Sequence, residues 1–92
     1  MRVKWLKRAL ANLDAEGEYI AQDSLKSAYK VVSKIHHSVN QLNQFPAMGR
    51  AGRVHGTREL VIPGLPYIIP YRVRNGDVEI LRVFHTSRKR SA

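Results

Sequence analysis

Apolar residues recur at helical spacing through the first half of the chain. Residues 2–5 alternate polar and apolar side chains, which predicts a short strand. An apolar series then runs at steps of three and four from Leu6 to Ile20, and a second, more regular series follows it. The second series predicts an amphipathic helix with one buried stripe, made of Leu25, Ala28, Val32, Ile35, Val39 and Leu42.

The link between the two helical series is short. Asp23 and Ser24 lie there, and their side-chain oxygens can cap the start of the second helix. A short link brings consecutive helices back alongside each other, so we expect an antiparallel helical hairpin. The pair Phe45–Pro46 ends the second helix, because the residue before a proline is disfavoured in the α conformation. A glycine-rich, basic loop is expected at residues 47–56.

The second half of the chain has the apolar runs of strands. Residues 57–62 predict one strand, and residues 67–74 and 77–84 predict a hairpin around Asn75–Gly76. A two-residue turn there places Arg74 opposite Asp77 and Arg72 opposite Glu79, and these opposite charges support that register.

Two positions in this hairpin need separate treatment. Pro70 lacks a backbone N–H group, so we expect a bulge or an unpaired edge beside it. Strict alternation along the last strand places Arg82 on the same face as Val78, Ile80 and Phe84.

The expected fold is α+β with the order β-α-α-β-β-β, in which a two-helix hairpin packs on one face of a small, mainly antiparallel sheet. A chain of 92 residues has room for one hydrophobic core. We therefore expect a single domain at residues 1–86, followed by a basic tail at residues 87–92.

Composition excludes several classes of site. The chain has no cysteine, and its four histidines stand in no metal-ligand spacing with carboxylates. We therefore expect neither a metal nor a cofactor. The sequence also lacks an apolar run of membrane-spanning length and the apolar block of a signal peptide, which favours a cytoplasmic protein.

The formal net charge is +9, and the excess is concentrated in residues 45–92, which hold nine Lys/Arg and three Asp/Glu. Such an excess attracts nucleic acid or an acidic protein partner. The alternative is a general contribution to solubility with weak affinity for polyanions.

Arg82 and His85 are the candidates for chemistry. Arg82 interrupts an apolar strand and is placed for a phosphate or carboxylate of a partner. The alternatives are a structural ion pair and a side chain at the sheet edge that extends its charged end into water. His85 ends that strand and acts either as a general acid or base or as a packed structural side chain. Any such chemistry would be metal-free RNA cleavage, in which Arg58, Arg82, His85 and Arg88 handle protons and charge.

Further cations are candidates for binding a target or partner. Arg50 and Arg53 lie in the glycine-rich loop, where the alternative is simple solvation, and Arg58 begins the second strand. The tail adds Arg88, Lys89 and Arg90.

Four segments together resemble the RelE/ParE superfamily of bacterial type II toxins. They are residues 42–50, 57–61, 66–73 and 78–85, the last reading Val-Glu-Ile-Leu-Arg-Val-Phe-His, followed by the basic tail. The resemblance covers nearly the whole chain and implies the same β-α-α-β-β-β fold. It also implies a toxin held in a hetero-oligomer with a cognate antitoxin, ParD-like or RelB-like.

The superfamily has two functional branches, and this sequence departs from one of them. RelE-like members are ribosome-dependent mRNA endonucleases with an arginine directly after the tyrosine of the third strand, lysines on the second strand and a tyrosine in the tail. Here Ile68 follows Tyr67, the second strand has no lysine, and no tyrosine follows Tyr71.

That departure favours the ParE-like branch, whose members poison DNA gyrase. The resemblance thus implies a gyrase inhibitor that arrests growth. The alternatives are an mRNA endonuclease acting at the ribosome and a nontoxic binding module.

Overall fold

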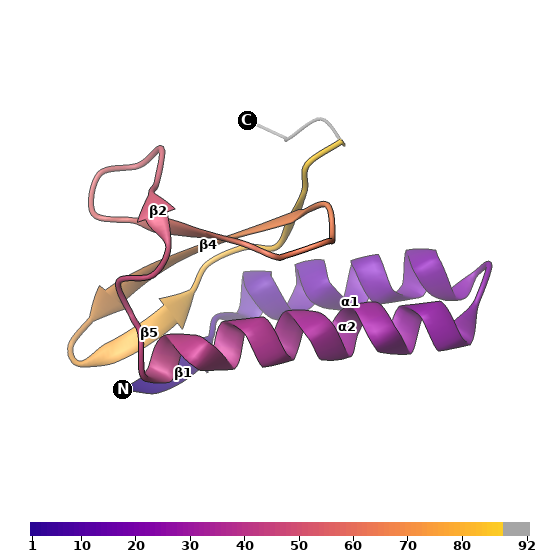
Figure 1. The fold of residues 1–92 in the computed structure, drawn as a ribbon, viewed down its shortest axis with the longest axis horizontal. Coiled ribbons are helices and arrows are strands. Elements are labelled where there is room, and N and C mark those ends of the chain that lie inside the picture. Colours follow the sequence, from indigo (N-terminus) through magenta and orange to yellow (C-terminus); the bar gives the residue numbers. More distant parts are fainter. Residues whose placement is uncertain (88–92) are drawn as a thin grey trace.

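A computed structural model of the protein describes residues 1–87. Two helices and a small mixed sheet form two layers, with the helical hairpin along one side of the sheet (Figure 1). The expected α+β architecture and the order β-α-α-β-β-β are confirmed. The structure adds a 3-10 turn η1 (Gln41–Asn43), a two-residue strand β2 (Arg50–Ala51) and a division of the last predicted strand in two.

The helical layer consists of α1 (Lys7–Ala21) and α2 (Leu25–Asn40). Ser24 caps α2 as predicted, because its Oγ accepts a hydrogen bond from the Ser27 N–H at 3.1 Å. The middle of the second apolar series is buried, with Ile35 and Val39 fully inaccessible. Its first member is not: Leu25 is 78% exposed, because the helix begins at the hairpin tip, beyond the edge of the sheet (Figure 1).

The sheet has the strand order β1-β5-β4-β3-β2, with β6 also paired to β4. Its members are β1 (Arg2–Trp5), β3 (Arg58–Val61), β4 (Tyr67–Arg74), β5 (Asp77–Ile80) and β6 (Phe84–His85), together with β2. The first strand runs parallel to β5, pairing Val3 with Val78, whereas the other ladders are antiparallel. The core lies between sheet and helices and includes Leu13, Ile35, Ile69, Tyr71 and Ile80.

The predicted hairpin register is confirmed. Tyr71 pairs with Ile80 and Arg72 with Glu79, and the turn residues Asn75 and Gly76 both have positive φ, at 52° and 78°. The Arg72 Nε donates to Glu79 Oε1 at 2.7 Å, so that ion pair forms. Asp77, by contrast, accepts from Arg2 of the parallel strand β1 at 2.9 Å rather than from Arg74 across the turn.

A β-bulge divides the last predicted strand. Opposite the two residues of β4 that follow Ile68, the other strand has three, residues 81–83, before Phe84 pairs with Ile68. The bulge lies beside Pro70, as the missing N–H group of proline predicted. The Pro70 carbonyl still accepts a hydrogen bond from Leu81 N–H at 2.9 Å. The extra residue shifts the alternation, so Val83, rather than Arg82, joins the core.

The prediction that Arg82 lies on the same face as Val78 and Ile80 is therefore wrong. Arg82 lies with Phe84 on the face of the sheet away from the helices, where both line a cavity. Within residues 1–87, no helix is both long and apolar enough to cross a membrane.

Candidate binding face of the sheet

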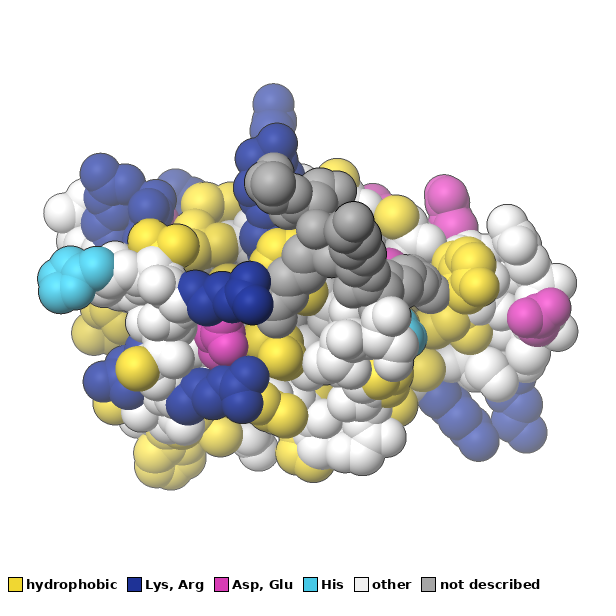
Figure 2. Space-filling model, turned by 90° about the horizontal axis from the view of Figure 1, so that it is seen from above, with side chains coloured by type: hydrophobic (Ala, Val, Ile, Leu, Met, Phe, Trp, Pro, Cys, Tyr) yellow, Lys and Arg dark blue, Asp and Glu magenta, His cyan; other side chains and the backbone are white. Residues whose placement is uncertain are grey.

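The side of the sheet opposite the helices carries a cavity of about 570 Å³. Basic side chains surround hydrophobic and acidic groups on this side (Figure 2). Residues from the start of α1, the β2–β3 loop, β3, β4, the bulge and β6 contribute to the wall. They are Leu6, Arg8, Arg53, Val54, Thr57, Glu59, Pro70, Leu81, Arg82 and Phe84. The wall is mostly apolar, with arginines from three separate segments.

Arg82 is the half-buried cation of this cavity. Burial lowers the pKa of its guanidinium, and the positive charge of Arg8 lowers that pKa further. Among residues 1–87, no carboxylate forms an ion pair with Arg82. The structural ion pair considered for Arg82 is therefore absent from this part of the chain, and the guanidinium is partly desolvated without a counter-ion.

His85 lies elsewhere. Its ring meets the ring of Tyr67 edge-on, with centroids 5.3 Å apart, and its Nδ1 accepts a hydrogen bond from Ser87 N–H at 3.1 Å. Tyr67 belongs to the core, and its hydroxyl donates to Glu16 of α1 at 3.0 Å. The contacts of His85 are thus with the helix-facing core rather than with the cavity of Arg82, so the two predicted chemical groups do not share one site.

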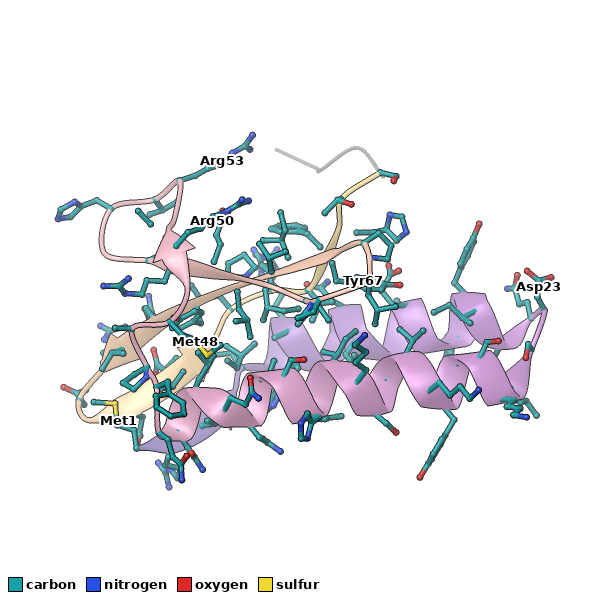
Figure 3. The ribbon with its side chains drawn as sticks, in the orientation of Figure 1. Met1, Asp23, Met48, Arg50, Arg53 and Tyr67 are labelled. Carbon is teal, nitrogen blue, oxygen red and sulfur yellow. The ribbon has the colours of Figure 1, made fainter. Side chains whose placement is uncertain are left out.

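The glycine-rich loop places its two arginines differently. Arg50 donates through Nε and Nη2 to Oε1 of Glu59, each at 3.2 Å, and Glu59 is only 7% exposed. Arg50 thus pairs with a buried carboxylate, while its own side chain stays 59% exposed to solvent. Arg53 lines the cavity from the loop, and both arginines lie on the side of the sheet away from the helices (Figure 3).

Arg58 has a structural role that the sequence did not predict. The sequence offered it as a candidate for handling charge or binding a target, but its Nη1 donates to the carbonyls of Gly49 at 2.9 Å and Ala47 at 3.3 Å. The neighbouring Tyr71 hydroxyl accepts from Gly49 N–H at 2.9 Å and donates to the Pro46 carbonyl at 2.7 Å. Arg58 and Tyr71 together fix the segment that follows η1.

The close approach at this segment requires a glycine. A Cβ atom at Gly49 would lie 2.6 Å from both Cε1 and the hydroxyl of Tyr71, and 2.9 Å from the Glu59 carbonyl oxygen. Burial raises the pKa of Tyr71, while the hydrogen bond from Gly49 and the charge of Arg58 act in the opposite direction.

Arg8 is the cavity residue that sequence reasoning missed. It lies in the first turn of α1 as an ordinary exposed helix residue, and only the tertiary fold brings it near Arg82. Three predicted residues, Arg88, Lys89 and Arg90, lie outside the described part of the chain. Within residues 1–87, no group of three His, Cys, Asp or Glu side chains is placed to hold a metal ion.

Comparison with known protein families assigns the chain to a family. The family described as the ParE toxin of the type II toxin–antitoxin system parDE matches residues 3–90. The chain belongs to this ParE toxin family. The predicted superfamily is thereby confirmed, and the protein is a toxin of a type II toxin–antitoxin system, which implies an antitoxin partner.

Individual proteins agree with this assignment. The chain is 50% identical over 84 residues to a Sinorhizobium fredii protein named "Putative toxin Y4kP", covering 91% of this chain and 86% of that one. It is 34% identical over 87 residues to Toxin RelE2 of Caulobacter vibrioides, covering 95% and 97%.

A solved structure confirms the ParE-like fold. A chain of the chromosomal ParDE toxin–antitoxin system from P. aeruginosa superposes with a TM-score of 0.86 at 32% identity. The match covers 95% of this chain and 97% of the other. The names of the similar proteins come from both branches, RelE and ParE.

Proposed function

We propose that this ParE-family toxin inhibits DNA gyrase and arrests growth, and that a cognate antitoxin neutralises it. The observation that carries the proposal is the side chain after Tyr67. A RelE-type nuclease has an arginine there, whereas this chain has Ile68, which is 8% exposed and pairs with Val61 and Phe84 across the sheet. No cation is available at that position to stabilise a cleaved phosphate.

The arrangement of the remaining cations supports the same proposal. Cleavage of RNA through its 2′-hydroxyl needs a proton acceptor and a charge stabiliser within reach of one phosphate. Arg82 lines the cavity, whereas His85 contacts Tyr67. Arg58 donates to backbone carbonyls, and Arg72 is paired with Glu79. These positions do not favour a nuclease site in which such groups act together on one phosphate.

The alternative is a ribosome-dependent mRNA endonuclease, and the observation that favours it is the similarity to Toxin RelE2. In that case Arg82 and Arg8 would bind the RNA phosphates. The two functions differ in their target, so one set of measurements separates them.

The test pairs two assays on the purified toxin. In the first, gyrase supercoils a plasmid, and we expect the toxin to block supercoiling and to accumulate cleaved DNA only when gyrase is present. In the second, translating ribosomes carry a defined mRNA, which we expect to stay intact. Intact supercoiling together with codon-dependent mRNA cleavage would establish the alternative. Activity in neither assay, with no growth arrest on expression, would indicate a nontoxic binding module.

The antitoxin is proposed to bind through an acidic segment. A chain of net charge +9 attracts such a segment at long range, and this attraction acts mainly on the association rate. We expect the association rate with the antitoxin to fall when NaCl rises from about 0.05 M to about 0.5 M, because salt screens exposed charges. Surface-based binding kinetics measure this, and an association rate independent of salt would contradict the proposal.

A further inference from the structure

The cavity on the open face combines two kinds of wall. Its apolar part comes from Leu6, Val54, Pro70, Leu81 and Phe84, on five different segments. Its cationic part comes from Arg8 on α1, Arg53 on the loop and Arg82 in the bulge. The volume of about 570 Å³ falls in the range of small-molecule sites, about 300–1,000 Å³. Such sites are typically apolar, with a few charged groups that fix the orientation of the ligand.

Within the described residues 1–87, carboxylates do not balance the positive charges of the cavity wall. Glu59 is the acidic member of the lining, and its carboxylate is already engaged by Arg50. Within residues 1–87, Arg8, Arg53 and Arg82 form no ion pair with any carboxylate. Arg8 and Arg82 also repel each other across a partly desolvated space. A bound anion would relieve this repulsion and supply the missing counter-charge.

The apolar wall adds a second requirement. An inorganic anion alone would leave the surfaces of Leu81 and Val54 in contact with water, whereas an apolar body would cover them. We infer that the cavity is a binding site for a small organic anion with an apolar body, whose carboxylate or phosphate lies between Arg8 and Arg82. This inference is independent of the gyrase proposal, because it concerns a ligand of the toxin itself.

A set of matched probes tests both halves of the site. The probe 1-naphthyl phosphate has an apolar ring system and a phosphate, 1-naphthol has the ring system alone, and inorganic phosphate has the anion alone. We expect isothermal titration calorimetry to show saturable binding of 1-naphthyl phosphate at one site. Binding of each partial probe should be weaker by about tenfold or more, because a hydrogen bond to a charged group or the burial of a ring is lost. Equal affinity for 1-naphthyl phosphate and inorganic phosphate would refute the apolar half of the site.

Substitutions then place the probe in the cavity. Arg82→Gln replaces the guanidinium with a shorter, uncharged amide that can still donate a hydrogen bond, and we expect it to weaken binding of 1-naphthyl phosphate about tenfold. Arg74→Gln removes the same charge from the exposed end of the hairpin, outside the cavity, and should leave binding unchanged. Equal losses in both variants would mean that the probe responds only to net charge, which would overturn the inference.

A third variant covers a failure of Arg82→Gln to fold. Val54 lines the cavity but is 68% exposed, so Val54→Ser alters the apolar wall with little effect on the core. We expect it to weaken binding of 1-naphthyl phosphate while leaving the affinity for inorganic phosphate unchanged. Unchanged affinity for both probes would refute the assignment of the apolar body to this cavity. Circular dichroism melting curves confirm folding in each case.

Discussion

The two faces of the sheet differ in how their polar and charged groups are partnered. On the helix-covered face, buried polar atoms have partners: the Tyr71 hydroxyl both accepts and donates, and no buried side-chain nitrogen or oxygen within residues 1–87 lacks a hydrogen bond. On the open face, Arg8, Arg53 and Arg82 surround an apolar cavity without a carboxylate partner in that part of the chain. Within residues 1–87, the buried polar atoms of the first face are satisfied, whereas the arginines of the second face have no carboxylate partner and are placed to bind a ligand.

The comparison suggests where stability and recognition are located. Substitutions in the covered layer should reduce the free energy of unfolding, and substitutions of the open-face cations should change binding instead. If cation substitutions destabilise the protein as strongly as core substitutions, the division between the faces is wrong.

The largest expected effect is in the covered layer. Ile35 of α2 is fully buried against the sheet, so Ile35→Ala leaves a cavity and should lower the free energy of unfolding by about 2–5 kcal/mol. Urea denaturation measures the loss. Leu25→Ala on the same helix is the matched control, because Leu25 is 78% exposed and its truncation should cost less than about 0.5 kcal/mol.

The next largest loss of stability is expected at Tyr71. Tyr71→Phe removes a buried hydroxyl and leaves the Gly49 N–H and the Pro46 carbonyl without this partner. We expect a loss of about 1–3 kcal/mol, again by urea denaturation. Tyr29→Phe is the control, since Tyr29 is 77% exposed and its hydroxyl should contribute little. Equal losses for the two variants would show that the two hydrogen bonds of the Tyr71 hydroxyl contribute no more stability than an exposed hydroxyl does.

The same residue predicts a dependence on alkaline pH. The pKa of Tyr71 is raised above its ordinary value of 10.0 in the folded protein, so the unfolded chain loses the phenol proton first. The contribution to stability is therefore fully present below pH 10.0 and is lost as the pH rises through the folded pKa. The free energy of unfolding of the wild type should fall more steeply in this range than that of Tyr71→Phe. Parallel curves would contradict the shift.

The smallest expected effect is on the open face. Arg53→Ala and Arg82→Gln should each change the free energy of unfolding by less than about 0.5 kcal/mol, because neither side chain holds a carboxylate within residues 1–87. Removing the charge of Arg82 also removes its repulsion with Arg8. A loss above 1 kcal/mol in calorimetric melting, about twice that limit, would place these cations in the structural part of the molecule.

Most of the fold could be predicted from local patterns in the sequence. The helical stripe through Ile35 and Val39, the cap at Ser24 and the turn at Asn75–Gly76 each depend on residues within a few positions of one another. The hairpin register followed from the turn and from the charge pair of Arg72 and Glu79. Such features are predictable because their partners are close in sequence.

The site was less predictable because its contacts are not local. Pro70 indicated a bulge, but the side of the ladder that takes the extra residue decides which face Arg82 occupies. The structural role of Arg58 could not be predicted, because its partners are backbone carbonyls, which have no residue-type signature. Arg8 lies 74 positions from Arg82 and became a neighbour only through the packing of α1.

The parallel pairing of β1 with β5 also has a consequence for the order of events during synthesis. Residues 2–5 are made first, but the strand between them and the rest of the sheet, residues 77–80, is among the last. A nascent chain that ends before Asp77 therefore has no place for Val3 and lacks the core residues Val78 and Ile80. The ribosome must translate residues 77–80 before β1 can pair with the rest of the sheet, so an interrupted message yields a fragment without the native fold.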